Sequence, residues 1–202
     1  MSIVDKDKIS NKIIGLKDKD DNLRAELIRK GSLSDGYNRE MEALHNNNAK
    51  ELYRIMEKIG FPTSEKVGEE ASRAAWLIIQ HSIGQADFMK KSAELLEKAV
   101  KEKKADPLSL AYLADRIAVL EGRPQLFGTQ FDWDQSGKMN PNQIDDISKV
   151  NQRRQTLGLN TLEEQIEIMQ ESVKNENQKP PKDFKDRKLQ YDKWRKSVGW
   201  IK

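Results

Sequence analysis

Leu110–Phe131 reads LAYLADRIAVLEGRPQLFGTQF, and it decides the fold because it holds a helix, the end of that helix and a loop. Asp106-Pro107, just before it, supplies a helix N-cap and a favoured first helical residue. Gly122 predicts the end of the helix, because glycine readily adopts the left-handed conformation that closes one. This stretch predicts a helix followed by an ordered loop.

A carboxylate interrupts the apolar face of this helix. The spacing of four, three and four residues places four side chains on one face, namely Leu108, Tyr112, Asp115 and Val119. The loop that follows, Gly122–Gln130, is rich in amide and hydroxyl groups. A carboxylate on an apolar face beside such a loop predicts a site, although it does not define the chemistry.

Similar spacing predicts helices over most of the remaining chain. Apolar residues recur every three or four positions over 9–27, 37–59, 69–84, 87–103, 141–157 and 162–173. The segment at about 69–84 is apolar nearly all round at Ala74–Ile79, so we expect it to be the central buried helix. Residues 128–140 read as a short hairpin or ordered loop. We therefore predict an all-α fold, a compact bundle of about seven helices.

The composition changes near the C-terminus. We expect one helical domain over residues 1–178, followed by a basic, aromatic segment over 179–202. Lys174–Lys202 holds ten lysines and arginines against four aspartates and glutamates, with four large aromatic residues between them. We expect this segment to be an amphipathic helix packed on the body. The alternative is an arm that binds RNA or an acidic surface.

Composition also limits the chemistry. The chain has no cysteine, and its two histidines, His45 and His81, exclude a multi-histidine zinc site built from this chain alone. We therefore expect no metal and no cofactor. A net charge of +3 over 202 residues argues against nucleic acid as a partner, and no apolar run is long enough to predict a membrane span. We expect a cytoplasmic protein, with secretion without a cleaved signal left open.

Isolated polar residues in apolar helix faces are the strongest indication of a site. Five such residues each lie in a different helix: Asp20, Asn48, His81, Asp115 and Arg154. Burying a polar or charged group without a partner is costly, so these side chains must pair or meet water. We predict that they share one polar pocket. The alternative is a set of unrelated buried networks, such as an ion pair between Asp115 and an arginine.

The residue types of this pocket restrict its chemistry. Acid–base roles would fall to His81 and to the carboxylates of Asp115 or Asp20. A phosphate or carboxylate would be held by an arginine, and the backbone near Gly128 would approach a ligand closely because glycine has no side chain. The residues in these two binding roles are Arg116, Arg153, Arg154, Gly128, Thr129 and Gln130. No common nucleotide or zinc motif is present.

Several motifs together resemble an uncharacterised bacterial family, a domain of unknown function, over about residues 9–172. These motifs are Asp20 with Arg24, Gly60–Thr63, Ala75-Trp76 to Gln80-His81, Leu113–Arg116, Gly122–Gln130 and Arg153–Leu159. Two positions depart from the pattern of that family. His45 stands where an acidic residue is expected, and Ser82-Ile83 where Ala-Asp is common. The segment beyond Pro180 lies outside the resemblance.

The chain is also similar to a small helical class of ADP-ribosylarginine hydrolases found among bacterial effectors. This resemblance implies a metal-independent hydrolase of an ADP-ribose N-glycosidic bond, acting on an ADP-ribose-containing small molecule or an ADP-ribosylated protein. In that case His81, Asp115 and Asp20 would be catalytic. The signature residues Arg24, Gln80 and Gln125 would join the binding set named above, together with Asn48, which is not part of the signature. The rival hypothesis is a non-enzymatic ligand- or partner-binding module, including a toxin-associated or immunity protein.

Overall fold

The computed structural model describes residues 3–32 and 37–202. Backbone contacts divide the chain into two compact units, Met1–Asp106 and Pro107–Lys202. The single helical domain expected over residues 1–178 stays a prediction.

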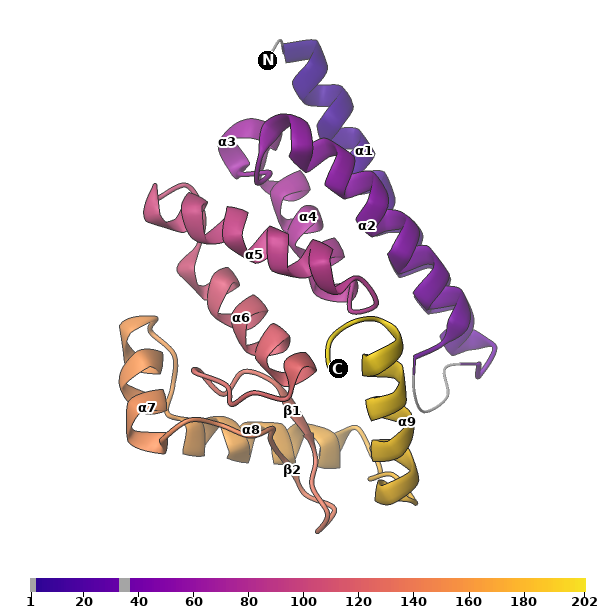
Figure 1. Cartoon of the computed structure of the whole chain (residues 1–202), viewed down its shortest axis with the longest axis vertical. Helices are drawn as coiled ribbons and strands as arrows, with labels where there is room; N and C mark the ends of the chain where they lie inside the picture. The colour runs from indigo at the N-terminus through magenta and orange to yellow at the C-terminus, as the bar shows by residue number, and fades with distance from the viewer. Residues whose placement is uncertain (1–2, 33–36) are drawn as a thin grey trace. The chain divides into compact units, whose positions relative to one another are not determined.

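The first unit is built from helices alone among its described residues. These are α1 (Ile3–Arg29), α2 (Arg39–Ile59), α3 (Ser64–Val67), α4 (Glu69–His81) and α5 (Ala86–Lys101). Helices α1 and α2 run side by side (Figure 1), and α4 packs against α1, α2, α3 and α5. Ala75 and Ile79 of α4 are fully buried. The expected central helix is therefore central to this unit.

Local sequence explains where these helices begin and end. The Asn38 side chain caps α2 by accepting hydrogen bonds from the backbone N–H groups of Glu40 and Met41. Gly60 ends α2 with a φ of +70°, which favours glycine. Along α1, Ile13, Leu16 and Leu27 are buried at the predicted spacing, with Asp20 buried among them. The predicted apolar face of α1, including its polar member, is confirmed.

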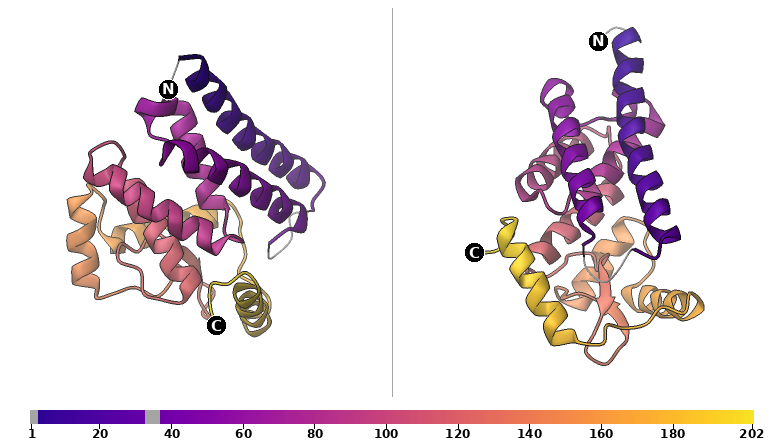
Figure 2. Two further views of the ribbon diagram at one scale, coloured as in Figure 1. Left: turned by 45° about the horizontal axis from the view of Figure 1, so that its top comes forward. Right: turned by 90° about the vertical axis from the view of Figure 1, so that its right-hand side faces the viewer.

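The second unit contains helices and one small hairpin. Its elements are α6 (Pro107–Glu121), β1 (Phe131–Trp133), β2 (Met139–Pro141), α7 (Ile147–Thr156), α8 (Leu162–Asn175) and α9 (Phe184–Ser197). β1 and β2 pair antiparallel, with Asp132 opposite Asn140, and β2 packs against α8 (Figures 1 and 2). The hairpin spans Phe131–Pro141 and so ends one residue beyond the predicted interval 128–140. Thr161 and Glu164 form the predicted capping box at the start of α8.

Two sequence-based expectations for this unit are wrong in detail. The helix expected from residue 141 begins at Ile147, because Pro141 belongs to β2 and Asp146 is the N-cap. In α6 the expected face is only half-buried at Leu108, Tyr112 and Val119. The helix instead buries two neighbouring lines of side chains, which are Ala111, Asp115 and Ala118, and Leu113, Ile117 and Leu120.

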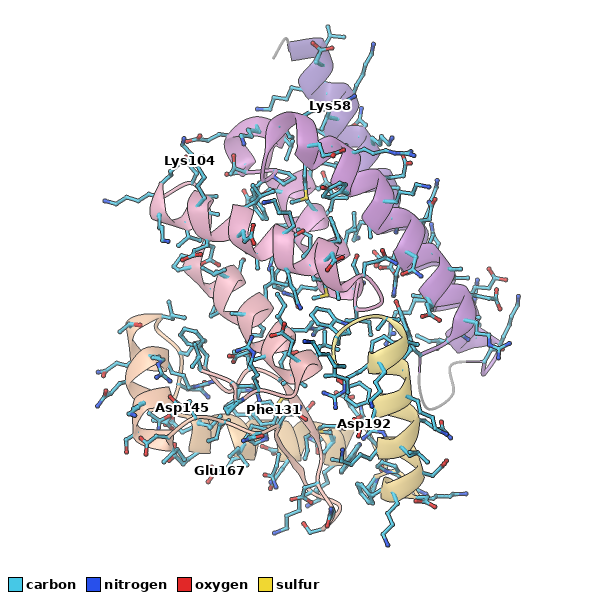
Figure 3. All side chains as sticks on the ribbon, in the orientation of Figure 1. Lys58, Lys104, Phe131, Asp145, Glu167 and Asp192 are labelled. Atoms are coloured by element: carbon cyan, nitrogen blue, oxygen red, sulfur yellow. The ribbon has the colours of Figure 1, made fainter. Side chains whose placement is uncertain are left out.

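The basic C-terminal segment forms α9, which contacts the end of α6. The Arg195 guanidinium donates a hydrogen bond of 3.1 Å to the carbonyl of Leu120 in the last turn of α6. The same guanidinium lies 4.9 Å from the centre of the Tyr191 ring and pairs with Asp192, which Figure 3 labels on α9. A cation at a helix C-terminus is favoured by the helix dipole.

The chain is all-α, apart from the two short strands, as predicted. Among the residues that the structure describes, no helix is both long enough and apolar enough to cross a membrane.

Candidate functional site

Three polar side chains from three helices of the first unit meet at one point. Asp20 of α1 lies between His45 of α2 and His81, the last residue of α4. His45 Nε2 is 3.0 Å from Asp20 Oδ1, and His81 Nδ1 is 2.6 Å from Asp20 Oδ2. Each carboxylate oxygen therefore faces one imidazole ring. We call these three residues the Asp20 cluster.

The charge of Asp20 determines the direction of these hydrogen bonds. Burial alone would raise the pKa of Asp20, but the hydrogen bonds with His45 and His81 hold the pKa well below its ordinary value. Asp20 is thus a carboxylate at neutral pH and accepts both bonds. It follows that His45 donates from Nε2 and His81 donates from Nδ1.

Tyr37 extends the cluster on the other side of His45. Its hydroxyl is 2.6 Å from His45 Nδ1 and 3.3 Å from the backbone carbonyl of His81. Burial raises the pKa of Tyr37, and the negative charges of Glu42 and Asp20 raise it further, so the hydroxyl keeps its proton. The Tyr37 hydroxyl can therefore donate to neutral His45. If His45 takes up a second proton, the same hydroxyl can accept from His45 and donate to His81.

Burial decreases from one end of the cluster to the other. The side chains of Asp20 and His45 are 5% and 9% exposed, whereas the side chain of His81 is 38% exposed. Because His81 uses Nδ1 to bind Asp20, its Nε2 is the atom left for a further partner. Within 3–32 and 37–202, no protein group hydrogen-bonds this nitrogen. A histidine oriented by a buried carboxylate, with a second nitrogen accessible, is suited to accept and return a proton.

Sequence reasoning did not place His45 in the site. Along α2, Leu44 and His45 are both at helical spacing from Met41, and apolarity favoured Leu44 as the buried residue. The structure buries His45 and leaves Leu44 half-buried. The series Met41, His45, Asn48 and Leu52 is equally regular, so helical spacing alone would have admitted the histidine.

Asp115, in the second unit, holds the loop that follows α6. Its carboxylate is completely buried and accepts hydrogen bonds from the backbone N–H groups of Leu126, Phe127 and Thr129 at 2.8 to 3.2 Å. The Thr129 hydroxyl donates a further bond of 3.0 Å. Burial raises the pKa of Asp115, and these hydrogen bonds oppose the rise. The carboxylate thus fixes the conformation of the loop.

Arg154 and Gln125 hold the same loop through their own side chains. The buried Arg154 guanidinium donates to the carbonyl of Phe127 at 2.8 Å and to Asn160 at 2.7 and 2.8 Å. The Gln125 side chain, also buried, bonds the backbone N–H and carbonyl of Gln130. Both residues were expected to bind ligand. In the structure Arg154 links the loop to Asn160, and Gln125 links it to the carbonyl of Asn142 at 3.0 Å.

Gly128 is required by the packing of this loop. Its φ is +62°, and a Cβ at this position would lie 2.8 Å from Leu162 Cδ1. The glycine was expected to let the backbone approach a ligand, but here it lets the loop approach α8. The neighbouring Thr129 and Gln130 are half-buried, and the Gln130 amide donates to the Thr129 hydroxyl.

The other expected binding residues are distributed over both units. In the first unit Arg24 is exposed, Gln80 is buried, and buried Asn48 donates to the carbonyl of Leu16 at 3.0 Å. In the second unit Arg116 is half-buried, and Arg153 pairs with Asp145 at 2.8 Å. Among the five polar residues predicted to interrupt apolar helix faces, Asp20 and His81 are in direct contact. Asp115 and Arg154 both hydrogen-bond the loop after α6. A pocket shared by all five stays a prediction.

Comparison of the sequence with known protein families identifies one family that matches the chain. A family model described as a family of unknown function (DUF6624) matches residues 8–176. The chain belongs to this family. The DUF6624 region includes the Asp20 cluster and the Asp115 loop, whereas α9 lies beyond it. No curated protein and no solved structure matches the chain.

Proposed function

We propose that this DUF6624 protein is a hydrolase in which His81 transfers the proton. The observation that carries the proposal is the Asp20–His81 pair, with 2.6 Å between carboxylate and ring nitrogen and a His81 side chain that is 38% exposed. A buried carboxylate orients the imidazole and stabilises the positive charge that forms when the ring accepts a proton. The remaining nitrogen, Nε2, is the base.

The substrate class follows from the resemblance to helical ADP-ribosylarginine hydrolases. In this reaction water attacks the anomeric carbon of the ADP-ribosyl group, and the bond from that carbon to the guanidine nitrogen of arginine breaks. Nε2 of His81 accepts a proton from the attacking water and returns it to the departing guanidine nitrogen. The products are ADP-ribose and a protonated arginine side chain, and no metal takes part.

The two other carboxylates expected to be catalytic receive different roles in this proposal. Asp20 positions His81 rather than attacking the substrate, because both of its oxygens are engaged by histidine N–H groups. Asp115 shapes the loop after α6, since both of its oxygens are engaged by N–H and O–H donors of that loop. The proton transfer therefore depends on one side chain, His81.

The test is turnover of an ADP-ribosylated arginine peptide by the full chain in the presence of a metal chelator. Replacing His81 with glutamine is expected to lower kcat by about 10²–10⁴-fold, because a general base contributes that much. Asp20→Asn is expected to lower kcat as well, because its amide cannot accept from both histidines. Thermal midpoints of both variants report whether they remain folded.

A His81→Ala variant separates catalysis from structure. Added imidazole is expected to restore part of the lost turnover, since a free base can replace a side chain that was partly exposed. A merely structural role for His81 predicts no rescue. If His81→Gln turns over the substrate as fast as the wild-type chain while folded, the assignment is wrong.

The alternative, a non-enzymatic binding module, is favoured by one observation. A surface depression of about 430 Å³ lies between α1 and α4, with Ile14, Ala74 and Leu77 in its lining and Lys17, Glu69, Glu70 and Arg73 around them. None of these residues belongs to the Asp20 cluster. Binding of ADP-ribose or a peptide by wild-type protein, without turnover of any ADP-ribosylated arginine substrate, would support this alternative.

A further inference from the structure

We propose that Asp20, His45 and His81 form a binding site for one divalent transition-metal ion, with zinc as the expected occupant. The three side chains come from α1, α2 and α4, and each offers one ligand atom. These atoms all lie within 4.8 Å of one another. The inference rests on this juxtaposition and does not depend on the proposed hydrolase activity. It departs from the expectation of no metal, because two histidines together with one carboxylate supply three protein ligands for zinc.

The donor set indicates which ions fit. Two imidazole nitrogens and one carboxylate oxygen suit Zn²⁺ and other first-row divalent ions, whereas Mg²⁺ and Ca²⁺ prefer oxygen ligands alone. Zinc bonds of about 2.0–2.1 Å place tetrahedral ligand atoms about 3.4 Å apart. The three ligand atoms lie within 4.8 Å of one another, so they would have to approach by at most about 1.4 Å to surround an ion.

The surroundings of His45 support coordination. A histidine that binds a metal through one nitrogen almost always donates a hydrogen bond from the other. With His45 Nε2 on the ion, Nδ1–H donates to the Tyr37 hydroxyl, 2.6 Å away. The hydroxyl then donates to the carbonyl of His81, 3.3 Å away. Tyr37 can thus hydrogen-bond His45 Nδ1 both with and without a bound ion.

Exposure at one end leaves room for an ion to enter. Asp20 and His45 are buried, and His81 lies at the partly exposed end of the cluster. Three protein ligands leave the fourth tetrahedral position for water or another ligand. An ion bound to Nδ1 of His81 would leave the proton of the neutral ring on Nε2. Nε2 could then no longer act as a base. On the proposed function, zinc is therefore expected to inhibit turnover.

The test uses the full chain freed of metal by a chelator and then titrated with Co²⁺ and with Zn²⁺. We expect one ion per chain by calorimetry, the visible absorption of four-coordinate Co²⁺, and displacement of Co²⁺ by Zn²⁺. Mg²⁺ and Ca²⁺ are expected not to compete. Absence of a stoichiometric Co²⁺ or Zn²⁺ site in the folded protein overturns the proposal.

Variants identify the ligands. Tyr37→Phe is expected to weaken Zn²⁺ binding by about 10–100-fold, as loss of a partner of a ligating histidine does. Asp20→Asn and His45→Gln remove ligand atoms, so each is expected to weaken Zn²⁺ binding by more than about 100-fold. Glu69→Gln is the matched control, because it makes the same kind of change at an exposed position of α4. Equal affinity in all four variants overturns the proposal.

A measurement on the wild-type chain avoids any dependence on folding of the variants. Zinc is expected to shift the NMR signals of His45 Nε2 and His81 Nδ1 as coordinated nitrogens. A shift confined to His81 Nε2 indicates surface binding and contradicts the site. If the chain turns over substrate in chelator and binds no zinc, only the proposed zinc site is wrong. If the chain binds zinc and turns over substrate only with the ion bound, only the proposed metal-independent mechanism is wrong.

Discussion

Asp115 is completely buried, and its carboxylate accepts hydrogen bonds from three backbone N–H groups and one hydroxyl of the following loop. From the sequence it was a candidate catalytic acid, because its position on an apolar face pointed to a special role. The same position suits a structural anchor. Only the bonded partners distinguish the two, and they come from the loop at residues 126–129.

Replacing Asp115 with asparagine is expected to destabilise the protein by about 1–3 kcal/mol. The amide NH₂ would face the N–H groups of Phe127 and Thr129, which would lose an acceptor while partly buried. Chemical denaturation followed by circular dichroism measures the loss. Thr129→Val is the control, since it removes only the hydroxyl bond and is expected to cost about 1 kcal/mol. Equal stability of Asp115→Asn and wild type would contradict the anchor role.

At the scale of the element, the turn between β1 and β2 depends on one carboxylate. Asp134 accepts hydrogen bonds from the backbone N–H groups of Ser136 and Lys138, the Ser136 hydroxyl and the Asn140 amide. The bond from the Lys138 backbone N–H, with those from Ser136 and Asn140, lowers the pKa of Asp134 to about 2. These bonds order the turn of the hairpin, which lies in the interval where the sequence predicted a short hairpin or ordered loop.

The order of this turn is expected to depend on pH in the acid range. A carboxylate with a lowered pKa stabilises the folded form above its ordinary pKa of 3.8, and this contribution is lost as the pH falls towards 2. NMR shifts of the Ser136 and Lys138 amides are therefore expected to titrate with a midpoint near 2. Asp134→Asn should abolish this titration. A midpoint at the ordinary value of 3.8 would show that the bonds do not form in solution.

The contact between α9 and α6 depends on Arg195, whose guanidinium donates to the carbonyl of Leu120. Arg195→Met is expected to destabilise the protein by about 1–2 kcal/mol, because the C-terminus of α6 loses a charge-assisted hydrogen bond. Lys196→Met is the control, since Lys196 is exposed and its loss should change stability by less than about 0.5 kcal/mol. Equal midpoints of thermal unfolding for the two variants would be evidence against this contact.

At the scale of the whole molecule, helical periodicity was sufficient to predict the class of the fold. Residues 9–27 and 37–59 show regular apolar spacing, and the structure forms α1 and α2 there. The division into two compact units at Asp106 could not be read from helical periodicity, because it depends on which helices pack together. Helical spacing within each segment carries no information on its packing partner. The start of α7 was also misplaced, since Pro141 is compatible with a first helical residue and with a short strand.

Local sequence patterns pointed to some residues of the Asp20 cluster and missed another. Asp20 and His81 could be selected because each interrupts an apolar face, and burial of a polar group requires a partner. His45 was missed because apolarity favoured its neighbour Leu44. Arg154 and Gln125 were selected in the same way, and the structure shows protein partners for both side chains. Their predicted role in ligand binding stays a prediction. Which partner a buried polar group finds is a long-range property, and no local pattern encodes it.

The pattern of residue types was sufficient to predict that the chain is helical, where most helices begin and end, and which polar side chains lie on apolar faces. These features follow from the helical repeat and from capping residues such as Asn38 and Thr161, which act within a few positions along the chain. The contacts of Asp20 with His45 and His81, and those of Asp115 and Arg154 with the loop after α6, became known only from the packing of the helices. Those pairings join residues far apart in sequence, and packing between helices brings them within hydrogen-bonding distance.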